Sequence, residues 1–423
     1  MKRNFLTLLL FCGVVLMVWL AAFFWKNLRG AGPAFKRPPV DIVRLIEKLD
    51  ADSPEIPLRL QTGFSLSIFA QGLVDPRVMI LDPAGTLLVS VPSQGKVVAL
   101  PDRDRDGRAD SIVTVVDGLD RPHGMAFRCA PGCMLYIAEE GRVNAYSYNL
   151  KTMQAVKKQK IADLPEVGGH VTRTLLFLPR PYDDQLLISV GSSCNVCIED
   201  DWRRAKVLLV SAGGGDLRTF ASGLRNSVFM TIRPETREVW ATEMGRDLLG
   251  DDLPPDEINI IVRGRNYGWP FCYGKNIHDD DFDSAMKKTC REPEAYPSHI
   301  DIPAHSAPLG LFFFPEEGWP AEFRNNLLVA YHGSWNRSVP TGYKIVRCRL
   351  DGSGNLLEVD DFVTGWLTKE GTALGRPVDI MIRPGGTVFV SDDRAGVIYR
   401  ITRKSEEDEL SQKKLVFRTQ PGA

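Results

Sequence analysis

The feature that most constrains the fold is a recurring pair of apolar segments joined by a turn that contains Pro or Gly. In each copy the second segment ends in a small residue, and most copies follow one another at about 50 residues, the length of one four-stranded blade. Six copies close into a ring, so the sequence predicts an all-β, six-bladed β-propeller. A β-sandwich of many short strands would give no reason for this period. The closing small residues are Ser90, Ala138, Ser189, Ala241, Ala330 and Ser391.

The repeat also sets the expected domain boundaries. The propeller is expected over residues 60–402, and the long interval between Ala241 and Ala330 predicts an insertion at about residues 266–305. Residues 31–59 read as a linker with one short helix, because helical periodicity recurs there at residues 40–49. Residues 403–423 are strongly charged and are expected to form a disordered tail.

Residues 5–25 form an uncharged apolar run at the N-terminus. At about 1.5 Å rise per residue this run reaches roughly 30 Å, enough to cross a bilayer as a helix. Its end is rich in bulky aromatic residues, whereas a cleavage site needs small ones. One uncleaved transmembrane helix is therefore expected within residues 1–30, with a cleaved signal peptide as the alternative. Basic residues flank both ends, so charge does not decide its orientation.

Seven cysteines lie outside this run, and two pairs are closely spaced: Cys129 with Cys133, and Cys194 with Cys197. No His follows either pair, which excludes c-type haem attachment, and the pairs are too far apart for a compact zinc ribbon. Disulfides are the better interpretation, with Cys272–Cys290 as a third and Cys348 free. Disulfides favour a propeller outside the cytoplasm. We therefore expect a single-pass protein of the inner (cytoplasmic) membrane with its propeller on the periplasmic side.

The balance of charge argues against nucleic acid as a partner. The chain has 52 Lys and Arg against 53 Asp and Glu, a formal net charge of −1. Nucleic-acid-binding domains usually carry a basic surface.

A polar element stands just before every copy of the repeat. Since equivalent positions of a propeller lie at equivalent places around its axis, these residues are expected on one rim. A rim rich in Arg suits an anionic ligand, because guanidinium pairs with carboxylate or phosphate, and His provides a base near neutral pH. The residues before each first strand are Arg77, Arg121, His123, His170, Arg173, Arg225, Asn226, His305 and Arg376, and those after each second strand are Glu139, Glu243, His332 and Asp392.

An ordered set of motifs over about residues 60–402 resembles a known family. The motifs begin at Gly118 (GLDRPHG), Ser222 (SGLRNS), Thr242 (TEMGRDLLGDDLPPDEIN), Gly264 (GRNYGWP), Ala304 (AHSAPLG), His332 (HGSWNR) and Gly375 (GRPVD). This set is similar to that of the glucose/sorbosone dehydrogenases, propellers that use pyrroloquinoline quinone (PQQ). The motif at His332 is most similar to the sorbosone and pyranose dehydrogenase branch.

The resemblance implies an activity and site residues. It implies a sugar dehydrogenase in which His170 takes a hydroxyl proton while a hydride passes to PQQ. Arg225, Asn226 and Arg376 then contact the cofactor, and carbonyl oxygens of Gly245 and Arg246 bind Ca²⁺ beside the quinone. The electron acceptor and the sugar are not identified by the sequence.

Departures from the family pattern affect several positions. The turn Met244-Gly-Arg246 replaces a Gly-Pro turn of the glucose enzymes, which puts the calcium geometry in doubt. A cofactor-binding lysine has no clean counterpart, and Arg337 or Lys344 is the replacement to consider. His123 and His332 belong to the sorbosone-like branch and are also assigned to cofactor binding.

Three further signals have a structural and a functional interpretation. Asp102 begins a loop with carboxylates at calcium-loop positions but with Val113 at position 12, so a second Ca²⁺ and a solvated turn both stay open. The acidic loop formed by Asp251, Asp252, Asp256 and Glu257 either supports a metal or is merely solvated. Asn336-Arg-Ser338 fits the glycosylation pattern.

Two other functions remain alternatives at this stage. One is a non-catalytic propeller that binds a carbohydrate or a protein. The other is a lactonase-type hydrolase, which needs a metal cage that only Glu243, Asn226 and Asp392 could supply.

Overall fold

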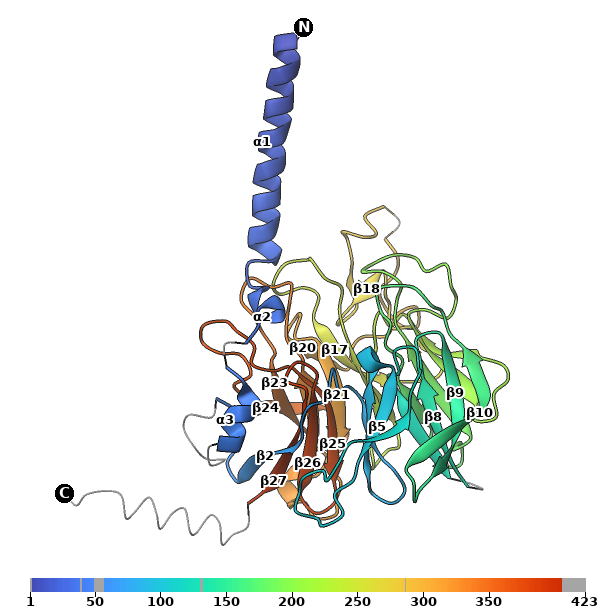
Figure 1. Ribbon diagram of the computed structural model, residues 1–423. Helices are drawn as coiled ribbons and strands as arrows, with labels where there is room; N and C mark the ends of the chain where they lie inside the picture. The colour runs from blue at the N-terminus through green and yellow to red at the C-terminus, as the bar shows by residue number, and fades with distance from the viewer. Residues whose placement is uncertain (1, 39, 49–56, 130–131, 286, 405–423) are drawn as a thin grey trace, which may run out of the picture.

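The computed structural model describes residues 2–38, 40–48, 57–129, 132–285 and 287–404. Six antiparallel sheets of four strands follow one another along the chain, and one of them gains a fifth, short strand (Figure 1). The expected six-bladed propeller is confirmed. Of the predicted tail, Arg403 ends the last strand, and residues 405–423 lie outside the described residues.

Each blade contains one copy of the repeat, with the first strand innermost. Blade 1 contains β3 (Met79–Leu81), β4 (Leu87–Val91), β5 (Lys96–Leu100) and β6 (Val113–Val116). Blade 2 contains β7 (Met125–Cys129), β8 (Cys133–Ala138), β9 (Arg142–Asn149) and β10 (Gln154–Asp163). Blade 3 contains β11 (Leu175–Phe177), β12 (Gln185–Val190), β13 (Lys206–Ser211) and β14 (Arg218–Ser222).

The second half of the ring has two additions. Blade 4 contains β15 (Met230–Ile232), β16 (Val239–Glu243), β17 (Asp256–Ile261) and β20 (Ile300–Ile302). Blade 5 contains β21 (Pro308–Phe313), β22 (Leu327–Tyr331), β23 (Lys344–Leu350), β24 (Leu356–Thr364) and, at its edge, β1 (Arg59–Leu60). Blade 6 contains β25 (Pro377–Arg383), β26 (Thr387–Asp392), β27 (Val397–Arg403) and β2 (Phe64–Ala70). Two 3₁₀ turns, η1 (Pro92–Gln94) and η2 (Ala321–Phe323), complete these blades.

The ring closes in two ways. The innermost strands contact each other in the circular order β3, β7, β11, β15, β21, β25 and back to β3. In addition, β2 from the beginning of the propeller pairs with β27 from its end, and so becomes the outer strand of blade 6. Because the two ends of the domain pair with each other, neither β2 nor β27 leaves this edge unpaired. The repeat alone did not predict this pairing.

The second strand is fully buried in three of the blades. All five residues are buried in β4, β16 and β22. These strands are covered on both faces by neighbouring blades, so an apolar residue is favoured at every position and no alternation is seen. This explains why the repeat is visible in the amino-acid sequence as continuous apolar runs.

The predicted insertion is shifted by a few residues. It lies between β17 and β20, at residues 262–299, and contains the small hairpin of β18 (Cys272–Tyr273) and β19 (Ile277–His278). His305 therefore follows β20 and belongs to the connection between blades 4 and 5.

The N-terminal region forms three helices: α1 (Lys2–Asn27), α2 (Gly32–Phe35) and α3 (Ile42–Lys48). Within the described residues one helix is long and apolar enough to cross a membrane, over Leu9–Asn27, with a mean hydropathy of 2.1. α3 packs on the propeller through Ile42, Val43 and Ile46, in one cluster with Phe64 of β2. Figure 1 shows α1 extending from the end of the propeller that carries β18.

Candidate functional site

The predicted polar residues gather at one rim because of strand direction. In an antiparallel blade the start of the first strand lies beside the end of the second, as in the pairing of Met125 with Ile137. The elements that precede β7, β11, β15 and β25 therefore lie at the same end of the ring as the residues that follow β8, β12, β16 and β26.

The carboxylates that follow the second strands bind backbone amides of their own blades. Glu139 accepts a hydrogen bond from the Asp120 amide at 2.8 Å, and Glu243 accepts one from the Asn226 amide at 2.7 Å. Asp392 accepts one from the Arg376 amide at 2.8 Å. These acids fix the segments that lead into the first strands.

These contacts leave few free carboxylate oxygens for the metal cage of a lactonase. The second oxygen of Glu243 accepts the Ser227 hydroxyl at 2.5 Å, and that of Asp392 accepts the Tyr399 hydroxyl at 3.0 Å. Both carboxylates are almost fully buried. Burial raises the pKa of Glu243 to about 8, with the neighbouring Glu257 adding to the shift.

His170 and Arg225 form the first wall of the rim, and His170 lies in the segment that leads into blade 3. Its Nδ1 lies 2.9 Å from the Ser192 carbonyl and 2.9 Å from the Ser192 hydroxyl. Because a carbonyl can only accept, Nδ1 carries the proton in the neutral ring and Nε2 carries the lone pair. The orientation is that of a proton acceptor.

The charge state of His170 agrees with this role. Burial, followed by the positive charge of Arg225, lowers the pKa of His170 to about 3. The ring is therefore neutral throughout the physiological pH range, which leaves the Nε2 lone pair unprotonated.

Arg225 is held firmly by its surroundings. Its Nε donates to the Asn195 carbonyl at 2.8 Å, and its Nη2 forms an ion pair with Asp247 at 3.0 Å. Its Nη1 donates to the Gly245 carbonyl at 2.8 Å. The neighbouring Asn226 is buried and contacts the Met244 sulfur at 3.6 Å.

This contact bears on the calcium prediction. The guanidinium of Arg225 occupies the space in front of the Gly245 carbonyl, where a cation would bind. The Arg246 side chain turns to the insertion, where it pairs with Asp279 at 2.7 Å. The nearby Asp256 accepts the amides of Gly245 and Ala307 at 2.9 Å each. The turn as it stands does not fit a Ca²⁺ ion.

A second wall of the rim is built around His332, which follows β22. Its Nε2 lies 2.9 Å from a carboxylate oxygen of Asp393, and Arg77 pairs with the same oxygen at 2.6 Å. Burial alone would raise the pKa of Asp393, but His332 and Arg77 hold it well below its usual range. Asp393 was missed by the sequence analysis, although it directly follows the predicted Asp392.

Arg376 completes this second wall. Its Nε donates to the His332 carbonyl at 3.1 Å and its Nη2 to the Gly333 carbonyl at 2.6 Å. Its guanidinium also lies over the Tyr343 ring, 5.6 Å from the centroid. Burial, more than any other cause, lowers the pKa of Arg376. A partly buried cation held by neutral carbonyls is well placed to receive a carboxylate.

Two other predicted cofactor ligands contact backbone carbonyls. His123 is only 2% exposed, its Nδ1 lies 3.2 Å from the Arg173 carbonyl, and its Nε2 has no hydrogen-bond partner within the described residues. Arg337 binds the carbonyls of Asp251 and Ala304 and pairs with Asp252 at 3.2 Å. Its own carbonyl accepts the Gly30 amide at 3.0 Å, which connects the rim to the end of α1. Lys344 pairs with Asp361 on β24 at 2.6 Å.

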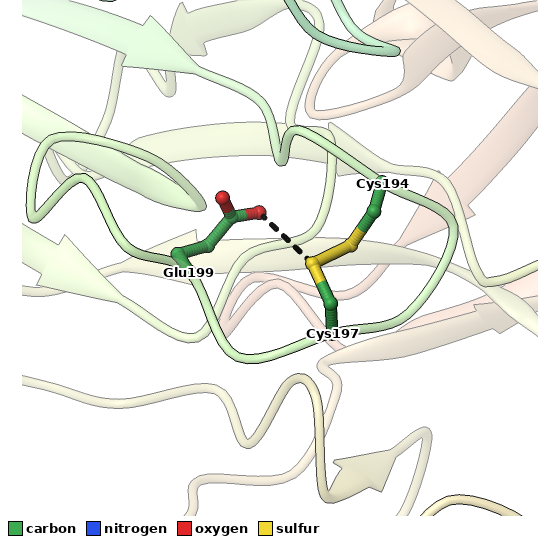
Figure 2. A group of neighbouring side chains, drawn as sticks. All are labelled: Cys194, Cys197 and Glu199. Atoms are coloured by element: carbon green, nitrogen blue, oxygen red, sulfur yellow. Dashed lines mark hydrogen bonds between the residues drawn. A yellow bond between two sulfur atoms is a disulfide. The ribbon is translucent and has the colours of Figure 1, made fainter.

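All three expected disulfides are present: Cys129–Cys133, Cys194–Cys197 and Cys272–Cys290. Cys348 is free and buried, as expected. Cys194 and Cys197 lie close to Glu199, and Figure 2 shows that the two sulfur atoms are bonded to each other. They are therefore not thiolate ligands.

The three remaining signals differ in what their contacts show. Asp102, Asp104 and Asp106 do converge. They also accept backbone amides of their own loop, as a solvated turn would, so the two interpretations of this loop stay open. Glu257 accepts the Gly274 amide at 2.6 Å and so supports the insertion. Asn336 is 1% exposed and donates to Asp247 at 2.9 Å, which leaves no room for a glycan.

The fold and this site define a six-bladed propeller whose rim combines a neutral, oriented histidine with buried arginines. The family model described as TrAA12-like matches residues 58–404. The chain belongs to this family, and the resemblance seen in the motifs is confirmed.

Two relatives illustrate the family. An uncharacterized protein of Borreliella burgdorferi is 29% identical over 86% of this chain and 96% of its own length. The pyrroloquinoline quinone-dependent pyranose dehydrogenase of Coprinopsis cinerea is 24% identical over 84% of this chain and 56% of its own length, so the chain spans about half of that relative.

Solved structures agree on the fold. The holo form of the Coprinopsis cinerea pyranose dehydrogenase PQQ domain has a TM-score of 0.67 at 22% identity, covering 82% of this chain and 97% of that domain. The Trichoderma reesei enzyme of carbohydrate-active family AA12, in its iodide structure, has a TM-score of 0.71 at 22% identity, covering 84% of this chain and 99% of the other.

Proposed function

We propose that this protein is a PQQ-dependent sugar dehydrogenase that oxidises an aldose or a related hydroxyl with His170 as the base. The observation that carries the proposal is the pair of walls at the rim. One offers an oriented, neutral imidazole, and the other offers guanidinium groups that are short of carboxylate partners. Relatives named as PQQ-dependent support the same ligand.

The donor set suits a tricarboxylate such as PQQ. Arg376 and Arg77 supply two guanidinium groups, with Asp393 and the nearby Asp75 as the carboxylates beside Arg77, whereas Arg376 is held only by carbonyls. A bound carboxylate would balance the excess positive charge in a site largely shielded from water. When bound, PQQ supplies the two-electron chemistry that accepts a hydride.

The protein's own contribution is proton transfer and positioning. His170 Nε2 takes the proton of the sugar hydroxyl as the C–H bond breaks, and the bond from Nδ1 to Ser192 keeps the ring in the required tautomer. The imidazolium that forms is then stabilised by the Ser192 carbonyl. Arg225 fixes the turn at Gly245 beside it.

Calcium is not used in this mechanism. Binding at the carbonyls of Gly245 and Arg246, as predicted, requires Arg225 to release the Gly245 carbonyl. This contact is also what favours the second candidate, a propeller that binds a carbohydrate or protein without turnover.

We also propose that α1 anchors the protein in the inner membrane with the propeller on the periplasmic side. Three disulfides support an oxidising compartment. The segment that follows α1 contacts the rim, because Arg394, next to Asp393, donates to the Pro33 and Ala34 carbonyls at 3.0 and 3.1 Å. The site would then face the bilayer, which favours an electron acceptor within the membrane.

The test is a titration of the purified full-length protein with PQQ, followed by an assay of aldoses with an artificial electron acceptor. Each is run with added Ca²⁺ and with a chelator. We expect saturable binding and turnover of at least one aldose. Binding of a sugar without any binding of PQQ would instead support the non-catalytic propeller. Activity that requires Ca²⁺ would show that Arg225 moves in the active enzyme.

A further inference from the structure

A short loop after β12 contacts both functional residues of the first wall. Residues 191–199 have no regular secondary structure, but the Cys194–Cys197 disulfide closes them into a compact turn (Figure 2). Glu199 accepts the Ser193 amide at 2.7 Å, and the Ser192 hydroxyl donates to the Cys194 carbonyl at 2.7 Å. The loop is therefore stabilised by a disulfide and hydrogen bonds between its own residues.

Ser192, just before the disulfide, holds His170. Both its carbonyl and its hydroxyl lie 2.9 Å from Nδ1 of the imidazole. The Ser192 hydroxyl contacts Cys194 as well, so the ring of His170 and the disulfide share one hydrogen-bonded unit.

Asn195, inside the disulfide, holds Arg225. Its carbonyl accepts from Nε at 2.8 Å and its Oδ1 from Nη2 at 2.9 Å, so that it grips two nitrogens of the guanidinium. The same Oδ1 accepts the Asp247 amide at 2.8 Å, and its Nδ2 donates to the Asp247 carbonyl at 3.1 Å. One asparagine thus joins blade 3 to the turn between β16 and β17 of blade 4.

We propose that the disulfide-closed loop is the positioning element of the site, with Asn195 as a positioning residue that fixes Arg225 and the turn at Asp247. The inference rests on the proposed function for its catalytic consequence, although its structural part does not. An asparagine in a loop can keep both its carbonyl and its amide group aligned only if the backbone is restrained. The disulfide supplies that restraint, because the cross-link limits the conformations open to the residues it encloses.

The consequence is a site that depends on the oxidised state of one disulfide. Reduction of Cys194–Cys197 leaves the core of blade 3 untouched, since β11 to β14 pair with each other independently of the loop. Reduction is instead expected to weaken the contacts that hold Arg225, Asp247 and His170. Reduction is therefore expected to affect the site more than the fold.

The test compares Asn195→Ala with wild type by hydrogen exchange, PQQ titration and steady-state kinetics on the full chain. The Asp247 amide reports directly on the contact, because it donates to Asn195 Oδ1. We expect this amide to exchange at least tenfold faster in the variant, and PQQ to bind about tenfold more weakly. Asn195→Asp, which keeps Oδ1, should restore part of both.

Matched controls separate positioning from general stability. Asn149→Ala removes a loop asparagine whose Oδ1 accepts the Lys151 and Thr152 amides in the β9–β10 turn, away from the rim. A Cys194→Ser, Cys197→Ser double variant is compared with Cys129→Ser, Cys133→Ser, which removes the disulfide of the β7–β8 turn. Of the two double variants, only Cys194→Ser, Cys197→Ser is expected to speed exchange of the Asp247 amide and to weaken PQQ binding.

The outcomes are distinguishable. Unchanged exchange of the Asp247 amide in Asn195→Ala and in the Cys194–Cys197 variant would overturn the positioning role, whether or not PQQ binds. Faster exchange in a protein whose wild type binds no PQQ would support the positioning role and reject the proposed function instead. Equal effects from both disulfide variants would show general destabilisation and would also overturn the inference.

Discussion

The two walls of the rim use the same residue types to different effect. On each wall a partly buried histidine lies near an arginine. His170 is paired with the neutral oxygens of Ser192, whereas His332 is paired with the carboxylate of Asp393. The first arrangement gives an oriented base with a bare nitrogen, and the second gives a compact set of charges. The partner of the histidine, more than the histidine itself, defines the chemistry of each wall.

The largest expected effect is on turnover when His170 is replaced. His170→Gln should lower kcat by about 10²- to 10⁴-fold, the usual contribution of a general base, while PQQ binds with little change. His332→Gln should do the reverse, weakening PQQ binding more than it lowers kcat. Measuring kcat and PQQ affinity for both variants checks the comparison, and equal losses of kcat would break it.

Stability should respond most to the charge at the centre of the second wall. Asp393→Asn leaves Arg77 and His332 without their carboxylate and should cost about 3 kcal/mol of folding free energy, as in other broken buried ion pairs. PQQ should then raise Tm more in this variant than in wild type, since its carboxylates replace the lost charge. Asp163→Asn, which removes an exposed pair with Lys160, is the control and should change Tm little.

Arg376 should matter for affinity and not for the chemical step. Arg376→Met removes one charge-assisted contact and is expected to weaken PQQ binding about 10- to 100-fold, with kcat at saturating PQQ nearly retained. Isothermal titration of the variant measures this effect. Wild-type affinity would show that the second wall does not bind the carboxylates.

The smallest effect concerns the pH dependence of stability. Glu243 and Glu257 have a pKa raised by burial to about 8 and about 7, above that of the unfolded chain, so the folded state binds more protons. Stability should therefore fall as pH rises from about 6.5 to 8. His123 and His170, whose pKa is lowered by burial to about 3, act in the opposite direction at the lower end of this range, because they take up a proton only in the unfolded chain.

Thermal melts at these two pH values check the sign. Wild type should lose a few degrees of Tm at the higher pH, and Glu243→Gln, which resembles the protonated acid, should lose less. A Tm that rises over the same interval would contradict the assignment.

The sequence predicted the ring because its signal is local. Six copies of strand, turn and strand lie within short stretches, and continuous burial of strands such as β4 makes each copy visible. The closing pair of β2 and β27 joins residues at opposite ends of the domain, as in the pairing of Phe64 with Arg403. No local pattern specifies such a contact.

For the site, the sequence placed residues at the rim but could not say what each one contacts. Glu243 and Asp392 were correctly placed at strand ends, yet both bind backbone amides of their own blades. Arg337 was expected at the cofactor and lies instead at the junction with α1. Asn195 and Asp393 went unnoticed because neither belongs to the recurring pattern.

The central claim is that His170 removes a proton from the sugar on a propeller loaded with PQQ. The most direct measurement is single-turnover reduction of bound PQQ by excess aldose, followed by absorbance in wild type and in His170→Gln. The account predicts rapid reduction in wild type and reduction at least 100-fold slower in the variant, at similar occupancy. Equal rates in the two proteins, or a bound quinone that stays oxidised with every aldose, would contradict it.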